Sequence, residues 1–191
     1  MSNDLVKKAY DFAEKAHEGQ FRRDKKTPYF THPVAVAGIV RAAGGTDEEV
    51  AAALLHDVVE DTKHKLHELR NEFGWQVADI VEGLTDPDDI ARLPRSERKE
   101  KQAEHVSGQP DSVKKIKMAD QTCNVRDILA DPSKWKPHAA REYILGADKV
   151  VLACKGASSV IFSMYKSVRI EAEEKLDMPM FHEESSEPSF T

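Results

Sequence analysis

Ionisable residues end a run of small apolar residues in the first third of the chain. Residues 51–55 are apolar, and they are followed by His56, Asp57, Glu60 and Asp61. A buried charge is costly unless it is paired or bound to a metal. In a helix, residues four positions apart share a face, so His56 with Glu60 and Asp57 with Asp61 would form two neighbouring stripes about 100° apart. The sequence therefore predicts a mostly buried helix that presents these groups to one pocket.

His56 and Asp57 supply two donors of a metal site, and further ligands must come from other segments. Imidazole nitrogen together with carboxylate oxygen suits Zn, Fe or Mn. Two residues complete the set: His32 at the start of a predicted helix, and Asp120 on a polar stripe of a later, otherwise apolar helix. Two imidazoles and two carboxylates leave positions for water and substrate on an octahedral ion. Such an ion polarises a phosphoryl oxygen and lowers the pKa of water, as phosphoester or pyrophosphate hydrolysis requires.

Glu60 and Asp61 lie one turn beyond the metal-binding pair, where a carboxylate could orient or deprotonate an attacking water. The simpler interpretation makes the segment an amphipathic helix with solvated carboxylates and a hydrogen-bonded core histidine at His56. We favour the metal site because the charged cluster directly follows five apolar residues.

The elements that must position these residues are helices. Apolar residues recur at helical spacing in most of the chain, and no alternating strand pattern occurs. The sequence therefore predicts an all-α fold of about eight to ten helices in a single domain over residues 1–178. The predicted helices cover residues 4–17, a segment from 31, a segment from 47 that includes residues 51–62, 65–73, 75–84, a segment from 112, 137–154 and 158–175.

Two basic segments connect these helices. Residues 21–30 combine four basic side chains with aromatic residues and a proline, and such a loop could hold an anion. Residues 92–101 carry five basic side chains, which could meet a polyphosphate. For both segments the alternative is an ordinary solvated surface.

Composition limits the class of protein. The chain has 191 residues and a net charge of −6, which argues against nonspecific binding to nucleic acid or to a membrane surface. Its two cysteines, Cys123 and Cys154, lie in apolar periodic stretches and provide no disulfide framework. There is no signal segment or membrane span, so we expect a cytoplasmic protein. Residues 179–191 are polar and are expected to be disordered.

The three site segments resemble a known family. His32, His56-Asp57 and Asp120 resemble the H…HD…D pattern of the HD-domain metal-dependent phosphohydrolases, which are all-α. Residues 23–33, 55–62 and 117–127 are similar to the hydrolase domain of the RelA/SpoT alarmone enzymes. Because no synthetase or regulatory region is present, the chain resembles a stand-alone small alarmone hydrolase of the metazoan SpoT homologue type.

This resemblance implies removal of the 3′-pyrophosphate from (p)ppGpp with the help of Mn²⁺. It also implies a role for each matching residue: His32, His56, Asp57 and Asp120 as metal ligands, Glu60 and Asp61 as the pair that handles the water, and Arg23, Tyr29, Lys99 and Asn124 as substrate-binding residues. The expected partner is a small nucleotide, with no nucleic acid and no membrane. A homo-oligomer remains open.

Two positions depart from the family pattern. The segment Ala-Asp-Arg/Lys-Leu-His/Tyr-Asn becomes Ala-Asp-Gln-Thr-Cys-Asn here, with Gln121 in place of a basic residue and Cys123 in place of a ring. These changes could alter the substrate, so (p)ppApp, another 3′-phosphorylated nucleotide and NADPH are alternatives to (p)ppGpp. The other interpretation is that both positions only adjust packing. Two rival functions are a nucleotidase acting on 5′-monophosphates and a nucleotide sensor without turnover.

Overall fold

The computed structural model describes residues 2–183, and nearly all regular structure in that part is helical. It contains eleven α-helical segments, of which α4 and α7 have only four residues. The bounds are α1 Ser2–Ala16, α2 Thr31–Ala42, α3 Asp47–Leu55, α4 Val58–Asp61, α5 Leu66–Phe73, α6 Trp75–Leu84, α7 Asp88–Ala91, α8 Arg95–Ser107, α9 Asp111–Ala130, α10 Pro137–Cys154 and α11 Ser159–Leu176, with short 3₁₀ turns at Pro132–Lys134 and Lys155–Ala157. In residues 2–183 the only β contact is an isolated bridge between Phe21 and Pro28. The all-α prediction is confirmed.

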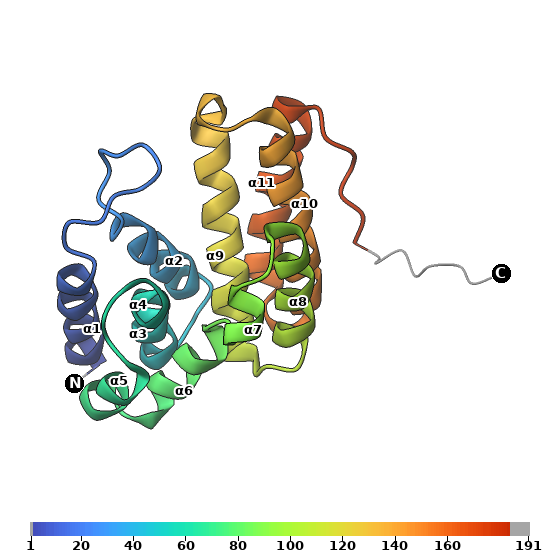
Figure 1. Ribbon diagram of the computed structural model, residues 1–191. Helices are drawn as coiled ribbons and strands as arrows, with labels where there is room; N and C mark the ends of the chain where they lie inside the picture. Colours follow the sequence, from blue (N-terminus) through green and yellow to red (C-terminus); the bar gives the residue numbers. More distant parts are fainter. Residues whose placement is uncertain (1, 184–191) are drawn as a thin grey trace.

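Helix α9 lies between two groups of helices (Figure 1). It packs against α2, α3 and α6 on one side and against α8, α10 and α11 on the other. Because both sides of α9 are covered, three of its polar residues, Asp120, Gln121 and Thr122, are buried together with its apolar ones. This central position brings Asp120 into the interior of the molecule.

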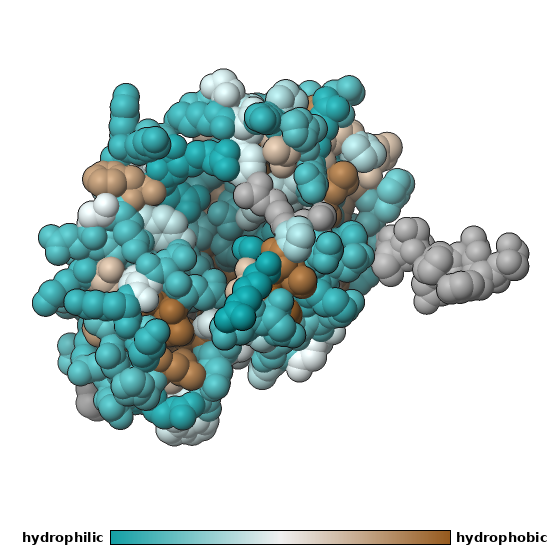
Figure 2. All heavy atoms as spheres, viewed as in Figure 1, coloured by the Kyte–Doolittle hydropathy of each residue, from teal (hydrophilic) through white to brown (hydrophobic). Residues whose placement is uncertain are grey.

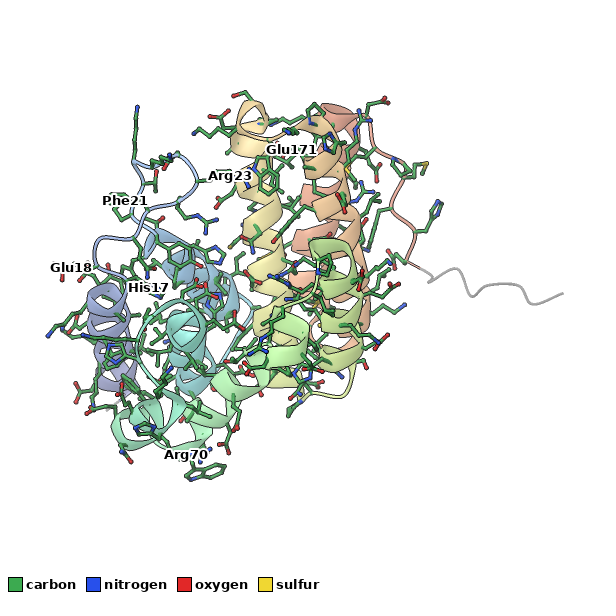
Figure 3. All side chains as sticks on the ribbon, in the orientation of Figure 1. His17, Glu18, Phe21, Arg23, Arg70 and Glu171 are labelled. Carbon is green, nitrogen blue, oxygen red and sulfur yellow. The ribbon has the colours of Figure 1, made fainter. Side chains whose placement is uncertain are left out.

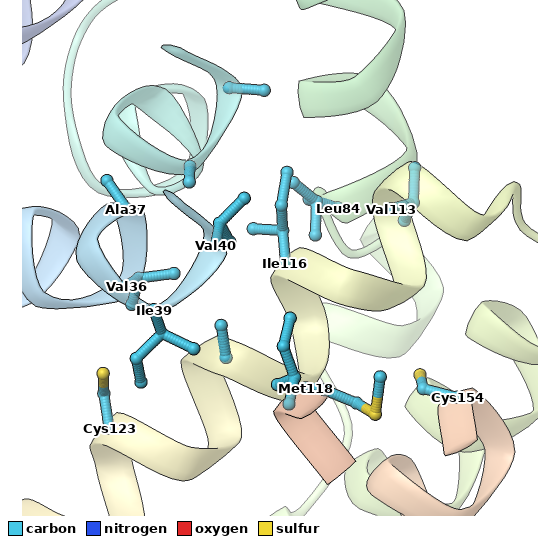
Figure 4. Close-up of a cluster of buried hydrophobic side chains, with 14 of the residues drawn as sticks. Val36, Ala37, Ile39, Val40, Leu84, Val113, Ile116, Met118, Cys123 and Cys154 are labelled. Atoms are coloured by element: carbon cyan, nitrogen blue, oxygen red, sulfur yellow. The ribbon is translucent and has the colours of Figure 1, made fainter. Parts of the chain in front are cut away.

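The contact between α2 and α9 is apolar. Val40 of α2 lies beside Ile116 of α9, and both side chains are fully buried (Figure 4). Full burial of an aliphatic side chain of this size stabilises the fold by about 1.5–3 kcal/mol. This packing sets the spacing between α2, which carries His32, and α9, which carries Asp120.

Local signals in the sequence explain where several helices begin. Thr46 caps α3 in a capping box: its hydroxyl accepts from the Glu49 amide at 3.2 Å, and the Glu49 carboxylate accepts from the Thr46 amide at 3.0 Å. Gly74, with φ of 83°, separates α5 from α6, as the sequence predicts. Ser158 caps α11 by accepting from the Ile161 amide.

The start of the predicted disordered tail packs against α11. Nη2 of Arg169 donates to the Pro179 carbonyl at 2.8 Å, and the Phe181 amide donates to the Glu173 carboxylate at 2.7 Å. Polar side chains of α11 thus hold the backbone at Pro179 and Phe181, which the sequence analysis includes in the tail. The rest of the predicted tail, residues 184–191, lies outside the described residues.

The face of the molecule seen in Figure 2 is mainly hydrophilic, with apolar residues exposed in small separate areas. No helix within residues 2–183 combines the length and apolar character needed to cross a membrane.

Candidate active site

The basic loop before α2 is held in a defined shape by its own side chains. The carboxylate of Asp24 accepts from the backbone amides of Lys26 and Thr27 at 2.9 and 2.8 Å and from the Thr27 hydroxyl at 2.6 Å. Lys25 takes the left-handed conformation, with φ of 59°, at the tip of this turn. The turn directs Arg23 towards the end of α9 (Figure 3).

The predicted continuous helix through residues 51–62 is interrupted, and this corrects the sequence analysis. Helix α3 ends at Leu55 and α4 begins at Val58, so His56 and Asp57 form a turn between them. Nδ1 of His56 bonds the Ala53 carbonyl at 2.8 Å. In a continuous α-helix that carbonyl would accept from the Asp57 amide instead. The interruption lets the two adjacent side chains approach each other, with His56 Nε2 at 3.1 Å from Asp57 Oδ2.

Side chains from three separate segments converge at this turn. Nε2 of His32 lies 3.1 Å from Oδ1 of Asp120 and 3.8 Å from Oδ2 of Asp57. Nε2 of His56 lies 3.9 Å from Oδ1 of Asp120. His32, His56 and Asp57 each offer one donor atom within 4.8 Å of the others, which makes them a possible metal site. Asp120 reaches this group through its contacts with both imidazoles. Helix α2 begins at Thr31, so His32 lies inside its first turn, at the helix start where the sequence predicts it.

The donor set fits a divalent cation. The hydrogen bond to Ala53 assigns the proton of neutral His56 to Nδ1, which leaves the lone pair of Nε2 directed at the carboxylates. This buried Nε2 atom has no hydrogen-bond partner among the described residues. Buried polar atoms are normally satisfied, and a metal ion would satisfy this one. Mixed nitrogen and oxygen donors suit Mn, Fe or Zn.

The electrostatics of the group also favour positive charge at its centre. Burial lowers the pKa of His56, but the charges of Asp57 and Asp120 outweigh burial and raise this pKa to about 9. Burial raises the pKa of Asp57, but contact with His56 and His32 outweighs it, and the pKa falls below the usual range. The pKa of Asp120 is lowered in the same way by the two histidines and Lys117. Two ionised carboxylates in a buried place therefore require a cation or a proton between them.

Hydrogen bonds from neighbouring side chains orient the two carboxylates. The Tyr29 hydroxyl donates to Oδ2 of Asp57 at 2.6 Å. Nδ2 of Asn124 donates to Oδ1 of Asp120, and Nε2 of Gln121 donates to Oδ2 of the same carboxylate, both at 2.6 Å. Such supporting bonds fix the rotation of metal ligands and tune their affinity.

Glu60 and Asp61 lie beside this group and remain accessible to solvent. Oε1 of Glu60 accepts from the Asp86 amide at 2.5 Å. Burial and the negative charges of Asp86 and Asp57 raise the pKa of Glu60. The hydrogen bond from the Asp86 amide and the positive charge of Lys117 lower it, but by less, so the pKa is about 7. Burial and the charge of Asp57 also raise the pKa of Asp61. A carboxylate with a pKa near neutrality that still meets solvent can exchange a proton with water.

A cavity of about 430 Å³ adjoins the group. Tyr29 and Asn124, which hold the two carboxylates, also line this cavity. Arg23 forms another part of the wall, with its guanidinium 3.9 Å from the centroid of the Trp135 ring. The cavity thus has a flat cationic surface in its wall, and Tyr29 and Asn124 connect that wall to the cluster of histidines and carboxylates.

The sequence analysis assigns no role to three residues near the site. Trp135 lies under Arg23 in the cavity wall. The ring of His17 is buried, with its centroid 5.0 Å from that of the Tyr29 ring. Lys117 received no role, but its ammonium lies 3.9 Å from the carboxylate of Asp86, near Glu60. The position of Lys117 one turn before Asp120 on α9 was a signal that could have identified it.

Lys99 is buried, and it does not belong to the described residues that line this cavity. Its Nζ donates to Oε1 of Gln121 at 2.6 Å and lies 4.8 Å from the centroid of the Tyr143 ring. Tyr143 is part of the cavity wall. The contact of Lys99 with phosphate stays a prediction.

The two departures from the family pattern lie behind the cavity. Gln121 and Cys123 are buried, and neither belongs to the described residues that line the cavity. Cys123 and Cys154 are both free. The placement of Gln121 and Cys123 therefore favours the interpretation that they adjust packing and the orientation of Asp120.

Comparisons with known proteins agree with this geometry. The HD domain model matches residues 9–145. The chain is 41% identical over 167 residues to the guanosine-3′,5′-bis(diphosphate) 3′-pyrophosphohydrolase MESH1 of Xenopus tropicalis, covering 84% of this chain and 92% of that protein. It is 42% identical over 154 residues to the Homo sapiens protein of the same name, covering 78% of this chain and 84% of that protein.

A solved structure described as a metazoan ortholog of SpoT that hydrolyses ppGpp superposes with a TM-score of 0.80 and 28% identity. The match covers 90% of this chain and 96% of that one. The matching fold, the domain model and the level of identity agree, and the chain therefore belongs to the HD-domain family, in the group that contains these MESH1 proteins.

Proposed function

We propose that this protein hydrolyses the 3′-pyrophosphate of (p)ppGpp to GDP or GTP and pyrophosphate, with Mn²⁺ as its metal ion. The proposal rests on one observation: four donor residues lie together beside a cavity, and Arg23 lines that cavity. The four donors are His32, His56, Asp57 and Asp120. The relatives named as guanosine-3′,5′-bis(diphosphate) 3′-pyrophosphohydrolases support the substrate.

The residues of the chain divide the chemistry between them. Arg23, stacked on Trp135, offers a flat cation that can lie against a nucleobase or a phosphate. Asn124 and Tyr29 extend from the cavity wall to the carboxylates, so a nucleotide in the cavity would place its phosphates at the four donors. A divalent ion held by these donors would polarise a phosphoryl oxygen and lower the pKa of water.

Glu60 is the group we propose as general base, with Asp61 orienting the attacking water. The water oxygen forms a bond to the phosphorus attached to the ribose 3′ oxygen, and Glu60 takes up the proton. The bond between that phosphorus and the 3′ oxygen then breaks, and the 3′ oxygen receives a proton as pyrophosphate leaves. Burial brings the pKa of Glu60 to about 7 before a cation binds, and a general base with a pKa at or below the working pH is available to take up a proton.

The position of Arg23 bears on the rival nucleotidase. An enzyme for 5′-monophosphates would be favoured if the Arg23 loop could not reach the cavity, but Arg23 forms part of the cavity wall. The accessible carboxylates of Glu60 and Asp61 argue against a sensor without turnover. (p)ppApp and NADPH are the alternative substrates.

Turnover of a nucleotide panel by the whole chain tests the proposal. We expect GDP and pyrophosphate from ppGpp in the presence of Mn²⁺, followed by ion-exchange chromatography, and loss of both with a chelator. The same assay with ppApp, NADPH and GMP separates the alternatives. Preferred release of phosphate from GMP would support the nucleotidase, and tight binding of ppGpp without any product would support the sensor.

The location of the protein in the cell is also a proposal. Cys123 and Cys154 are free and buried, which suits a reducing cytoplasm. Self-association remains a prediction.

A further inference from the structure

Lys99 is connected to the metal ligand Asp120 through a single amide side chain. Nζ of Lys99 donates to Oε1 of Gln121 at 2.6 Å, and Nε2 of Gln121 donates to Oδ2 of Asp120 at 2.6 Å. The exposed fractions of the three residues are 8%, 2% and 8%. Lys99 belongs to α8 and the other two residues to α9, so this series of hydrogen bonds links two helices.

Lys99 decides which end of the Gln121 amide faces Asp120. A glutamine amide has an oxygen that accepts and a nitrogen that donates, and a half turn exchanges the two ends with little change in shape. An ammonium group has donors only, so it can bond only the oxygen end. With the oxygen held by Lys99, the nitrogen must face the carboxylate. The opposite orientation would set the amide oxygen against the oxygen of Asp120.

The amide in turn sets the rotation of the Asp120 carboxylate. Oδ2 is occupied by Gln121, whereas Oδ1 accepts from Asn124 and faces Nε2 of His32 at 3.1 Å. Because each oxygen has its own partner, the carboxylate cannot rotate without losing a bond. Oδ1 is thereby held towards His32 and His56, as a metal ligand must be.

The packing of α8 on α10 leaves room for the stem of Lys99 at one position. A Cβ atom added at Gly146 of α10 would lie 2.9 Å from Cβ and 2.7 Å from Cγ of Lys99. Atoms so close to the backbone of α8 cannot move aside easily. The absence of a side chain at Gly146 therefore allows Lys99 to pass into the interior and reach Gln121.

We propose that Lys99 and Gln121 are positioning residues that hold Asp120 in its metal-binding rotation, with Lys99 setting the direction of the Gln121 amide. This inference rests on the metal site of the proposed function. It assigns Gln121 the task of donating to Asp120, and it gives Lys99 a role at the metal site whether or not it also contacts phosphate.

Mn²⁺ binding by the whole chain, measured by calorimetry without nucleotide, tests the pair. Loss of a residue that supports a metal ligand typically weakens metal affinity about 10- to 100-fold, and we expect such a loss for Lys99→Met and for Gln121→Leu. The double variant should bind no more weakly than the weaker single variant, because both changes remove the same support. Lys101→Met is the matched control, since Lys101 is an exposed residue of the same helix that pairs with Glu104.

A second substitution gives opposite effects in two backgrounds. Gln121→Lys in the natural chain would bring two ammonium groups together and should weaken Mn²⁺ binding. In the Lys99→Met background the same substitution supplies a group with donors only, which needs no partner to direct it towards Asp120. We therefore expect Gln121→Lys to restore most of the affinity lost in Lys99→Met, which a purely structural role of Lys99 would not predict.

The outcomes separate this inference from the proposed function. If the natural chain binds Mn²⁺ and Lys99→Met binds it equally well, the positioning role is wrong and the metal site stands. If the natural chain binds no Mn²⁺, the metal site and the positioning role are both wrong. Should Lys99→Met fail to fold by circular dichroism, Gln121→Leu decides alone, and an unchanged affinity in that variant overturns the inference.

Discussion

The hydroxyl group of Tyr29 donates to Oδ2 of Asp57 at 2.6 Å, which joins the basic loop to the turn between α3 and α4. Burial and the neighbouring charge of Asp57 raise the pKa of Tyr29, so the hydroxyl keeps its proton and remains a donor. The same tyrosine lines the cavity. One side chain therefore connects the proposed nucleotide cavity to the proposed metal site.

Tyr29→Phe should weaken Mn²⁺ affinity or turnover about 10- to 100-fold, because Asp57 loses the donor that fixes its rotation. Calorimetry with Mn²⁺ and steady-state kinetics with ppGpp measure the two effects. Tyr10→Phe, on the partly exposed Tyr10, provides the control. Unchanged values for Tyr29→Phe would show that Asp57 needs no such support.

Asp57→Ala and Glu60→Gln should separate metal binding from proton transfer. Asp57→Ala removes a ligand and should abolish both Mn²⁺ binding and activity. Glu60→Gln keeps all four ligands, so it should bind Mn²⁺ normally while turnover falls by about 10²-fold or more, the scale of general acid–base catalysis. Full activity of Glu60→Gln would mean that another group is the base.

Lys117→Met should move the acid side of the pH profile of kcat/KM to higher pH. A general base must be ionised, so the rate falls as the pH drops through its pKa. The pKa of Glu60 is about 7, and a bound cation would lower it. Lys117 also lowers the pKa of Glu60, and its removal should raise that pKa.

The profile is measured at saturating Mn²⁺ for the natural chain, Lys117→Met and the surface control Lys101→Met. An acid side that stays in place in Lys117→Met would argue against Glu60 as the titrating base.

Arg23→Met should raise KM for ppGpp by about tenfold or more, corresponding to about 1.4 kcal/mol, with a smaller effect on kcat. The substitution keeps an unbranched, flexible stem but removes the guanidinium cation that lies 3.9 Å from the Trp135 ring centroid. Arg70→Met is the control, because Arg70 lies on α5, away from the Arg23 loop (Figure 3). An equal loss in both variants would point to a general charge effect.

Arg169→Leu should destabilise the fold by about 3–5 kcal/mol, the usual cost of leaving one member of a buried ion pair without its partner. Nε of Arg169 donates to both carboxylate oxygens of Asp148 at 3.1 and 3.0 Å, and the Tyr165 hydroxyl donates to the same carboxylate. Urea unfolding measures the change, with Arg41→Leu at a surface pair as the control. If Arg169→Leu lost as little unfolding free energy as Arg41→Leu, the prediction would be contradicted.

The loss of unfolding free energy in Arg169→Leu should be smaller at low pH than at high pH. Burial raises the pKa of Asp148 even beside Arg169, and loss of Arg169 should raise it further. A carboxyl group with a raised pKa in the folded state favours folding at low pH and loses that contribution as the pH rises through the folded pKa. The deficit of Arg169→Leu should therefore be smaller at pH 5 than at pH 8.

Residue types and local spacing were enough to predict much of this protein. The all-α fold and the bounds of α10 followed from helical periodicity and from Pro137, because these signals act within a few residues. The sequence predicts His32, His56, Asp57 and Asp120 as metal ligands because a charged cluster within apolar segments needs a partner. The structure brings these four side chains together.

Other features depend on contacts between distant segments, which local patterns do not contain. The stacking of Arg23 on Trp135 needs the loop before α2 to meet the segment after α9. Likewise, the direction of the Lys99 ammonium is set by Gly146 of α10 and by Gln121 of α9. Packing between helices decides which polar groups meet in the interior, and the free energy of those contacts outweighs local preference.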